Sequence, residues 1–167
     1  NLDMERKSIY YINTQMKNGG ESMKVKDILR EKGSAVYSLR SDETIFEAIR
    51  KMSELNIGAL LIIDDDKVKG ILSERDYRDK VILKGRSSKS TPVSEIMTRQ
   101  VFCVSPNDSI HLCMKLMTEK RFRHLPVMKD DQLVGIISIG DVVKMVIDKQ
   151  KVEIKSLRNY IAGGYPA

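Results

Sequence analysis

Two serine–aspartate pairs are the residues of this sequence best suited to binding chemistry. The motif GILSERD ends at Asp76 and the motif GIISIGD ends at Asp141, with Ser73 and Ser138 three residues before them. Each pair follows an apolar run and opens a segment of helical period, which predicts a strand that leads into a helix. Free backbone N–H groups at a helix start attract anions, and a carboxylate there can accept both hydroxyls of a ribose. Alternatively, each aspartate only stabilises its helix start, by about 0.3–1 kcal/mol.

The two motifs belong to an internal duplication. Shifting the sequence by 65 residues aligns it with itself without gaps from Val36 to Ile82. The segments VKDIL (25–29) and VSEIM (93–97) align at a shift of 68 instead, which predicts a loop of different length before the first strand of each repeat. The identical pairs include Val36/Val101, Ile45/Ile110, Met52/Met117, Leu60/Leu125, Asp65/Asp130, Gly70/Gly135, Ser73/Ser138 and Asp76/Asp141.

Each repeat predicts the order strand, helix, strand, strand, helix, which is an α+β fold with a pseudo-two-fold relation between the halves. The first helix of each repeat carries one apolar stripe, over Ile45–Leu55 and Ile110–Met117, with Asp42 and Asn107 as plausible caps. Acidic turns between apolar runs predict two hairpins. The expected strands are 35–39, 59–63 and 68–72 in the first repeat, and 101–104, 125–128 and 133–137 in the second.

The domain limits follow from the repeat. Residues 1–22 are interpreted as an N-terminal tail, native or carried over from cloning, and 164–167 as a C-terminal tail. The first domain is expected over 23–90 and the second over 91–163, joined by the Ser- and Lys-rich linker KGRSSKSTPVS. One repeat is too small for a secure core, so the two copies are expected to pack together.

Composition excludes several classes. With 41% hydrophobic residues the chain is too apolar to be disordered, and no apolar run approaches the roughly 20 residues that span a bilayer. The net charge of +6 divides into about 0, +3 and +3 over the tail and the two repeats, without the basic arm and aromatics of a nucleic-acid binder. The two cysteines, Cys103 and Cys113, lack metal-site spacing and favour a reducing, cytoplasmic or organellar compartment, either as buried apolar residues or as redox sensors.

The two motifs, together with RHLPV (123–127), resemble the tandem cystathionine-β-synthase-type (CBS) domain pair, or Bateman module, and stand-alone CBS-pair regulatory proteins in particular. The resemblance covers Met23 to about Gly163. It implies an adenine-nucleotide ligand, AMP first, with ADP, ATP or an NAD-type ligand as alternatives, bound in clefts between the repeats. It also implies a homodimer that pairs through the striped helices.

The resemblance assigns roles residue by residue. Asp76 and Asp141 would hold ribose, while Ser73 and Ser138 would contact ribose or phosphate. Arg123 and His124 would grip phosphate in the second repeat, where the first repeat has Gly58 and Ala59. The first repeat instead offers Arg75. Alternatively, Arg75 is only an exposed arginine at a helix start. The remaining residues that would line the ligand are Val36, Tyr37, Val101, Phe102 and Pro126.

These observations favour a non-catalytic regulatory module that binds an adenine nucleotide and signals to a protein partner. Catalysis is disfavoured because the two histidines, His111 and His124, are far apart in the sequence and no nucleophile, carboxylate pair or metal cluster accompanies them. The alternative is a protein-docking scaffold or a nucleic-acid-binding module that senses no nucleotide. No catalytic residue, catalytic cofactor, metal ligand or membrane contact is expected.

Overall fold

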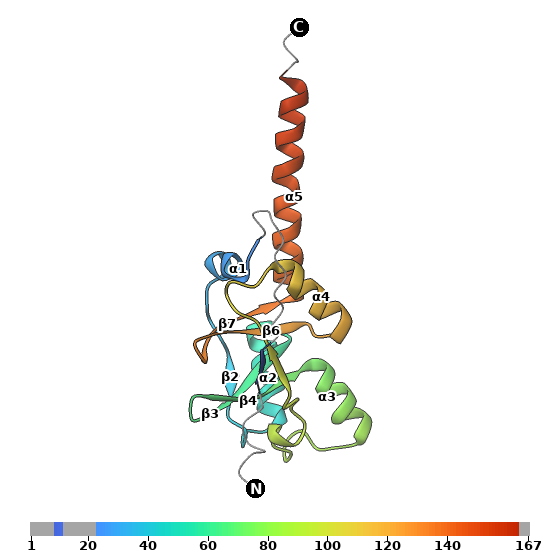
Figure 1. The fold of residues 1–167 in the computed structure, drawn as a ribbon. Coiled ribbons are helices and arrows are strands. Elements are labelled where there is room, and N and C mark those ends of the chain that lie inside the picture. The colour runs from blue at the N-terminus through green and yellow to red at the C-terminus, as the bar shows by residue number, and fades with distance from the viewer. Residues whose placement is uncertain (1–8, 12–22, 164–167) are drawn as a thin grey trace. The chain divides into compact units, whose positions relative to one another are not determined.

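The computed structural model describes residues 9–11 and 23–163 (Figure 1). Each repeat forms the predicted order of elements, so the α+β fold class is confirmed. The first repeat contains β2 (Ser38–Leu39), α2 (Ile45–Leu55), β3 (Ala59–Asp64), β4 (Lys67–Ser73), α3 (Glu74–Lys80) and the 3-10 turn η1 (Ile82–Lys84). The second contains β5 (Val101–Cys103), α4 (Ile110–Lys120), β6 (His124–Lys129), β7 (Gln132–Ser138) and α5 (Ile139–Ala162), and is preceded by η2 (Val93–Glu95). Two further elements precede the repeats, β1 (Ile9–Tyr11) and α1 (Val25–Lys32).

The chain forms two compact units that each take a segment from the sequence of the other repeat. Among the described residues, unit 1 comprises 9–11 and 35–104, and unit 2 comprises 23–34 and 105–163. In unit 2, α1 is attached to the second repeat by hydrogen bonds from Val25 N to Asp108 O (3.0 Å) and from Ile110 N to Met23 O (2.9 Å). The equivalent segment around η2 is hydrogen-bonded to the first repeat within unit 1, from Val93 N to Glu43 O (2.8 Å). The compact units therefore cut across the repeat boundaries.

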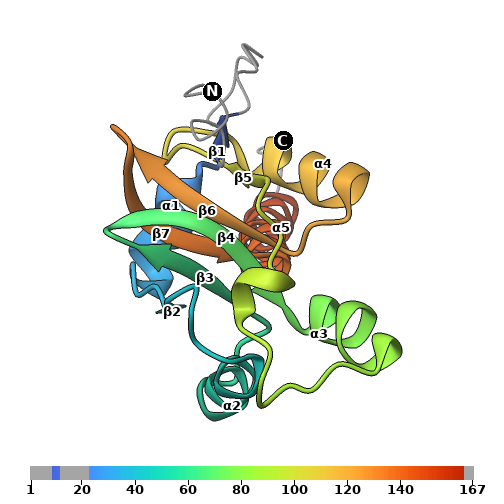
Figure 2. The same cartoon turned by 90° about the horizontal axis from the view of Figure 1, so that it is seen from below.

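Each unit contains an antiparallel hairpin, β3–β4 in unit 1 and β6–β7 in unit 2 (Figure 2). In unit 1 a parallel strand, β2, extends the sheet, and β1 pairs with β5 in parallel. The two-residue turns are Asp65–Asp66 and Asp130–Asp131, all four with φ between 49° and 60°. Positive φ at both central positions is the conformation that matches the twist of paired strands, and aspartate tolerates it better than most residues. The predicted hairpins are confirmed.

The caps of α2 and α4 differ from the sequence prediction. Thr44 and Ser109 are the N-caps, and their hydroxyls accept hydrogen bonds from Glu47 N (3.3 Å) and Leu112 N (3.1 Å). Asp42 and Asn107 lie two residues before the caps. The prediction was wrong because a capping side chain must bond the N–H two or three residues on, and only the residue directly before each helix is placed to do so.

Most side chains in the apolar stripes of α2 and α4 are buried within the chain. Ile45 and Met52 of α2 are buried in the core of unit 1, and Ile110 and Met117 of α4 are buried as well. The exposed large apolar side chains on these helices are Phe46 and Met114. The homodimer stays a prediction, but these two helices leave little apolar surface to support it. The core of unit 1 consists of Leu39, Ile45, Ala48, Met52, Leu60, Ile62, Leu72, Val81, Val93, Ile96 and Met97.

The glycine that opens each motif marks a close approach of the exchanged segment. A Cβ at Gly70 would lie 2.7 Å from Met97 Sδ and 3.0 Å from the carbonyl oxygen of Thr98. A Cβ at Gly135 would lie 2.7 Å from Leu29 Cδ2. Leu29 and Met97 occupy equivalent positions in VKDIL and VSEIM. The glycines are thus explained by packing against these segments.

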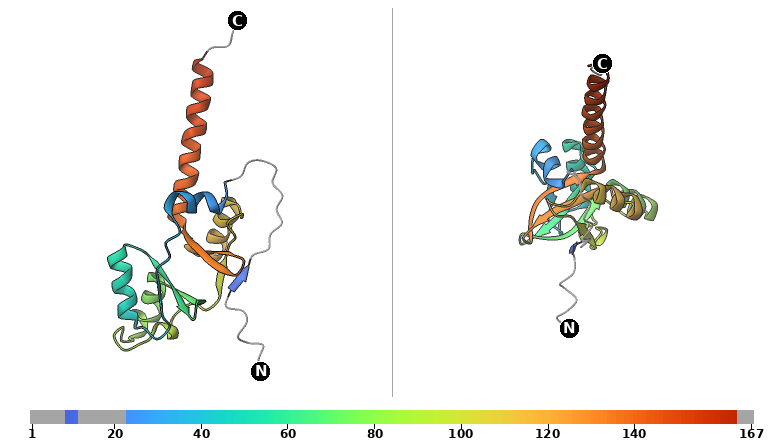
Figure 3. Two further views of the ribbon diagram at one scale, coloured as in Figure 1. Left: turned by 90° about the vertical axis from the view of Figure 1, so that its left-hand side faces the viewer. Right: turned by 45° about the horizontal axis from the view of Figure 1, so that its top comes forward.

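Helix α5 is much longer than its counterpart α3. It continues to Ala162, 24 residues in all, and extends well past the other elements of unit 2 (Figure 3). Every residue from Ile147 to Gly163 is exposed. No helix in the described part of the chain is both long and apolar enough to cross a membrane.

Most of the predicted terminal tails, 1–22 and 164–167, lies outside the described residues. The exception is Ile9–Tyr11, which forms β1. The extra residues predicted as a loop before the first strand lie partly in the last turn of α1 and partly in the segment 33–37, which has no regular structure.

Candidate functional site

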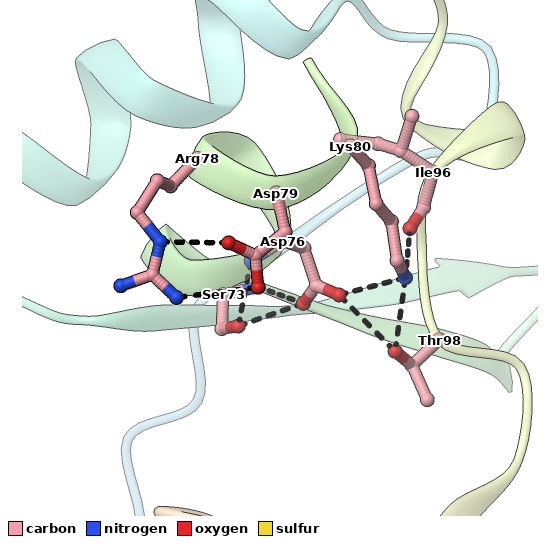
Figure 4. Close-up of polar contacts among 7 residues, drawn as sticks. All are labelled: Ser73, Asp76, Arg78, Asp79, Lys80, Ile96 and Thr98. Carbon is pink, nitrogen blue, oxygen red and sulfur yellow. Dashed lines mark hydrogen bonds and ion pairs between the residues drawn. The ribbon is translucent and has the colours of Figure 1, made fainter. Parts of the chain in front are cut away.

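Ser73 and Asp76 form a reciprocal cap at the junction of β4 and α3 (Figure 4). Asp76 Oδ2 accepts hydrogen bonds from Ser73 N (2.9 Å) and Ser73 Oγ (2.7 Å), and Asp76 N donates to Ser73 Oγ (3.3 Å). The other oxygen, Oδ1, pairs with Lys80 Nζ (2.7 Å) and accepts from Thr98 Oγ1 (3.3 Å). Both carboxylate oxygens are engaged, and the side chain is only 14% exposed.

This geometry limits what Asp76 can offer a ligand. A ribose hydroxyl would have to replace Lys80 or Thr98, and Lys80 is further held by the carbonyl oxygen of Ile96 (2.7 Å). Helix α3 has only seven residues, so its start attracts an anion less than the start of a long helix does. The helix-start role that the sequence left open for Asp76 is therefore present in the structure.

The junction of β7 and α5 in unit 2 repeats the cap but not its surroundings. Asp141 Oδ2 accepts hydrogen bonds from Ser138 N (2.7 Å), Ser138 Oγ (2.9 Å) and Lys32 Nζ (2.7 Å). Lys32 comes from the exchanged helix α1 and also donates to the carbonyl oxygen of Ile136 (3.0 Å). All three bonds converge on Oδ2. Within the described chain, Oδ1 of Asp141 has no hydrogen-bond donor, so this oxygen can accept one from a ligand.

Asp141 is held as a carboxylate. Burial alone would raise its pKa, but hydrogen bonds from Lys32 and Ser138, together with the charge of Lys32, outweigh burial, and the net pKa lies below the ordinary value for aspartate. The side chain is 22% exposed. Unit 2 therefore presents a stable anionic acceptor at the start of a 24-residue helix, next to a lysine.

Arg123 and His124 lie at the same junction. His124 begins β6 and is the ladder partner of Ser138, and Ile139 N donates to the carbonyl oxygen of Arg123 (2.9 Å). Arg123 is exposed and His124 half-buried. Pro126 is buried and pairs with Ile136, the residue whose carbonyl binds Lys32. Lys32 from α1, Arg123 and His124 at the start of β6, and Asp141 at the start of α5 thus come together at one strand–helix junction.

The same backbone frame carries small residues in unit 1. Ala59 is the ladder partner of Ser73, and Glu74 N donates to the carbonyl oxygen of Gly58 (3.2 Å). Arg75 is exposed in the first turn of α3. The junctions are therefore equivalent in backbone and different in charge.

The residues expected to line a base are more dispersed. Tyr37 is exposed and its carbonyl oxygen accepts from Leu61 N (3.3 Å), which places it and the preceding Val36 beside β3. Val101 and Phe102 lie in β5, whose partner strand is β1.

His124 is neutral at neutral pH in this structure. Its pKa is lowered, first by burial, then by the positive charges of Lys32 and Arg123, which together exceed the opposing effect of Asp141. The expectation that His124 brings a charge to a phosphate therefore does not hold before a ligand is bound.

Acidification from about pH 7.5 to about pH 5.5 is expected to destabilise the protein through His124. Because folding lowers the pKa of His124, the unfolded state takes up a proton first as the pH falls, and the free energy of unfolding decreases. Urea unfolding across this range measures the slope. His124→Asn should flatten it, whereas His111→Asn, at the exposed histidine, should leave it unchanged. Equal slopes in the wild type and His124→Asn would contradict the assignment.

Lys32, Lys80 and Thr98 are the site residues that sequence reasoning missed. Lys80 stands four residues after Asp76, a spacing that favours an ion pair on a helix and could have been noticed. Lys32 is 109 residues from Asp141, so no local pattern connects them. Its one signal is its place in the segment where the repeats differ by three residues.

The cysteines are poorly suited to redox chemistry. Both are buried, and burial raises the pKa of the Cys103 and Cys113 thiols to about 12. A thiol is reactive as its thiolate, so neither side chain is activated. Among the described residues, no three His, Cys, Asp or Glu side chains are grouped so that they could hold a metal ion.

The CBS domain family model matches residues 25–82 and 93–148. CBS domains are generally regulatory and non-catalytic. Among curated proteins, the chain is 39% identical over 157 residues to the mitochondrial CBS domain-containing protein CBSX3 of Arabidopsis thaliana, covering 89% of this chain and 76% of that protein.

Two solved structures show the same fold. A CBS-domain protein of Burkholderia ambifaria, for which a role in signal transduction has been suggested, is 49% identical with a TM-score of 0.75, covering 77% of this chain and 96% of the other. The CBS domain pair of protein MJ0100, in complex with 5′-methylthioadenosine and S-adenosyl-L-methionine, is 26% identical with a TM-score of 0.68, covering 77% and 98%. The chain belongs to the CBS-domain family and carries two CBS domains in tandem.

Proposed function

We propose that this protein is a non-catalytic regulatory module that binds an adenosyl ligand at the strand–helix junction of unit 2 and reports its level to a protein partner. The observation that carries the proposal is the convergence of Asp141, Lys32, Arg123 and His124 on the start of α5. The MJ0100 pair, solved with two adenosyl compounds, supports this class of ligand. A cytoplasmic or organellar location and AMP as first candidate belong to the same proposal.

Asp141, Arg123 and Lys32 each have a distinct part in the proposed complex. Asp141 accepts a ribose hydroxyl through Oδ1, which leaves its bonds to Ser138 intact. Arg123 donates to a phosphate, because its side chain is exposed and a guanidinium matches phosphate oxygens in geometry. Lys32 shields the carboxylate from the phosphate, since its ammonium lies 2.7 Å from Oδ2.

Unit 1 is the weaker site in this proposal. Both oxygens of Asp76 are engaged by Ser73, Lys80 and Thr98, and Gly58 and Ala59 offer no charged donor. A ligand there would have to break an existing ion pair. The difference in charge between the two junctions thus predicts one strong binding event and, at most, a second weaker one.

A panel of AMP, ADP, ATP, NAD, 5′-methylthioadenosine and S-adenosylmethionine tests the proposal by thermal unfolding. A ligand that binds only the folded state, at 100 times its dissociation constant, adds about 2.7 kcal/mol to the free energy of unfolding. No stabilisation by any of the six would overturn the proposed function. Salt-sensitive binding of RNA without nucleotide binding would instead support the nucleic-acid alternative.

Asp141→Ala is expected to weaken the best ligand of this panel by about 5- to 150-fold, because a ribose hydroxyl loses its acceptor, worth about 1–3 kcal/mol. Calorimetric titration measures the loss. Asp76→Ala is the matched control, since it removes the equivalent cap residue from unit 1. Equal affinity in the wild type and Asp141→Ala, with the variant folded, would exclude the ribose role of Asp141.

A further inference from the structure

Helix α5 carries a row of exposed apolar side chains that begins in its first half and continues past the other elements of unit 2. Val143, Ile147, Ile154, Leu157 and Ile161 are between 43% and 78% exposed. Their separations are four, seven, three and four residues, and Gln150 fills the one position missing from the series. This spacing, alternately three and four, is the heptad repeat of a coiled-coil seam.

The residue types specify the kind of coiled coil. Ile147, Ile154 and Ile161 fall at the first seam position, a, and Val143, Gln150 and Leu157 at the second, d. β-Branched residues at a with leucine at d, as at Leu157, favour two parallel strands. Most helical stability in proteins comes from packing of an apolar face, so a partner for the seam would stabilise α5.

We propose that α5, from Val143 to Ile161, pairs with the same helix of a second copy of this chain, as a short, parallel, in-register two-stranded coiled coil. The pairing is self-complementary, because each copy presents the same seam around a two-fold axis.

The charges beside the seam support a parallel partner of the same sequence. Glu153 occupies position g and Arg158, five residues on, occupies position e of the following heptad. In a parallel pair these positions face each other across the seam, so Glu153 of each copy meets Arg158 of the other. In an antiparallel pair position e faces position e, and all three e residues, Lys144, Lys151 and Arg158, are basic. Repulsion therefore disfavours the antiparallel arrangement.

The opposite face of the helix is polar and internally paired. Positions b, c and f include Asp148, Lys149, Lys155, Ser156 and Asn159. Lys149 pairs with Glu153 and Lys151 with Asp148, each at 3.9 Å. The apolar residues at these positions are Met145, Val152 and Ala162. The seam is bordered by basic residues at position e and by Val146, Glu153 and Tyr160 at position g, so its apolar face is wider on the g side.

Cysteine crosslinking of the full chain, without nucleotide, tests the pairing. Leu157→Cys places a thiol at a seam position, where equivalent Cα atoms of a parallel pair come within the range for a disulfide. Ser156→Cys, one residue away on the polar face, is the matched control. Because both native cysteines are buried, background crosslinking is expected to be low. After mild oxidation, Leu157→Cys should run as a disulfide-linked dimer on a non-reducing gel and Ser156→Cys as a monomer. Equal crosslinking of the two variants, or none of Leu157→Cys, would overturn the proposal.

Charge exchange provides a second, non-covalent test. Glu153→Arg and Arg158→Glu, each alone, should weaken dimerisation by about 2- to 30-fold, since each removes two exposed ion pairs per dimer. The double variant should restore it. Sedimentation velocity over a concentration series measures the dissociation constant. A double variant as weak as the single ones would exclude the parallel register. Flotation of the wild type with vesicles of phosphatidylcholine and phosphatidylserine, lost in Leu157→Asp, together with failure to crosslink, would assign the seam to a lipid surface and refute the self-pairing.

Discussion

Arg123→Ala is expected to lower the affinity for AMP by about 10- to 150-fold and to leave the affinity for adenosine within about threefold of the wild type. A hydrogen bond to a charged group contributes about 1.5–3 kcal/mol, against about 1 kcal/mol for a neutral one. Arg123 is exposed at the junction, whereas Lys32 is already bound to Asp141 and to the carbonyl oxygen of Ile136. Calorimetric titration of both ligands into both proteins gives the four dissociation constants.

Arg75→Ala is the matched control for Arg123→Ala, because Arg75 is an exposed arginine at the equivalent junction of unit 1. Its removal should affect only a weaker second binding event. If Arg123→Ala lost affinity equally for AMP and adenosine, the arginine would maintain structure rather than bind phosphate, and its assignment would fail. Because adenosine binding is measured in parallel, that outcome leaves the ribose role of Asp141 standing.

Leu60→Ala is expected to reduce the free energy of unfolding by about 2–5 kcal/mol. Leu60 is fully buried in β3, opposite Leu72, within the core of unit 1. The substitution removes buried methyl groups and leaves a cavity in a close-packed core. Urea unfolding followed by circular dichroism measures the change.

The control for this core substitution is Leu83→Ala. Leu83 is 70% exposed in η1, so its truncation should change stability by less than about 0.5 kcal/mol. Similar losses in the two variants would show that β3 does not form the centre of the packing.

The sequence predicted the elements inside each repeat because their signals are local. Hairpin turns such as Asp65–Asp66, the helical spacing from Ile45 onward, and the helix starts near Ser73 and Ser138 each depend on residues a few positions apart. Because of the duplication, each of these patterns occurs in both repeats, which strengthens the prediction. The family resemblance implied the roles of Arg123 and His124, and in the structure the hairpin register pairs His124 with Ser138.

What escaped prediction depends on contacts between distant segments. The bond between Lys32 and Asp141 and the transfer of α1 to unit 2 join residues about a hundred positions apart, and no periodicity records them. The neutral state of His124 arises from burial, which is a property of the packed unit. The length of α5 was missed for another reason. Beyond Ile147 it has no core to face, so the expected apolar stripe gives way to a narrower seam.

The exchange of α1 and η2 between the repeats bears on how such a chain can be divided and how it can have originated. A cut in the linker would separate Val25 and Ile28 from the unit that buries them, and would equally remove Val93, Ile96 and Met97 from the core of unit 1. Neither half-gene therefore encodes a self-sufficient folding unit. A single-repeat ancestor would have completed its core by exchanging this segment with a second, identical molecule. Fusion of two such genes makes the exchange intramolecular, so that it no longer depends on protein concentration.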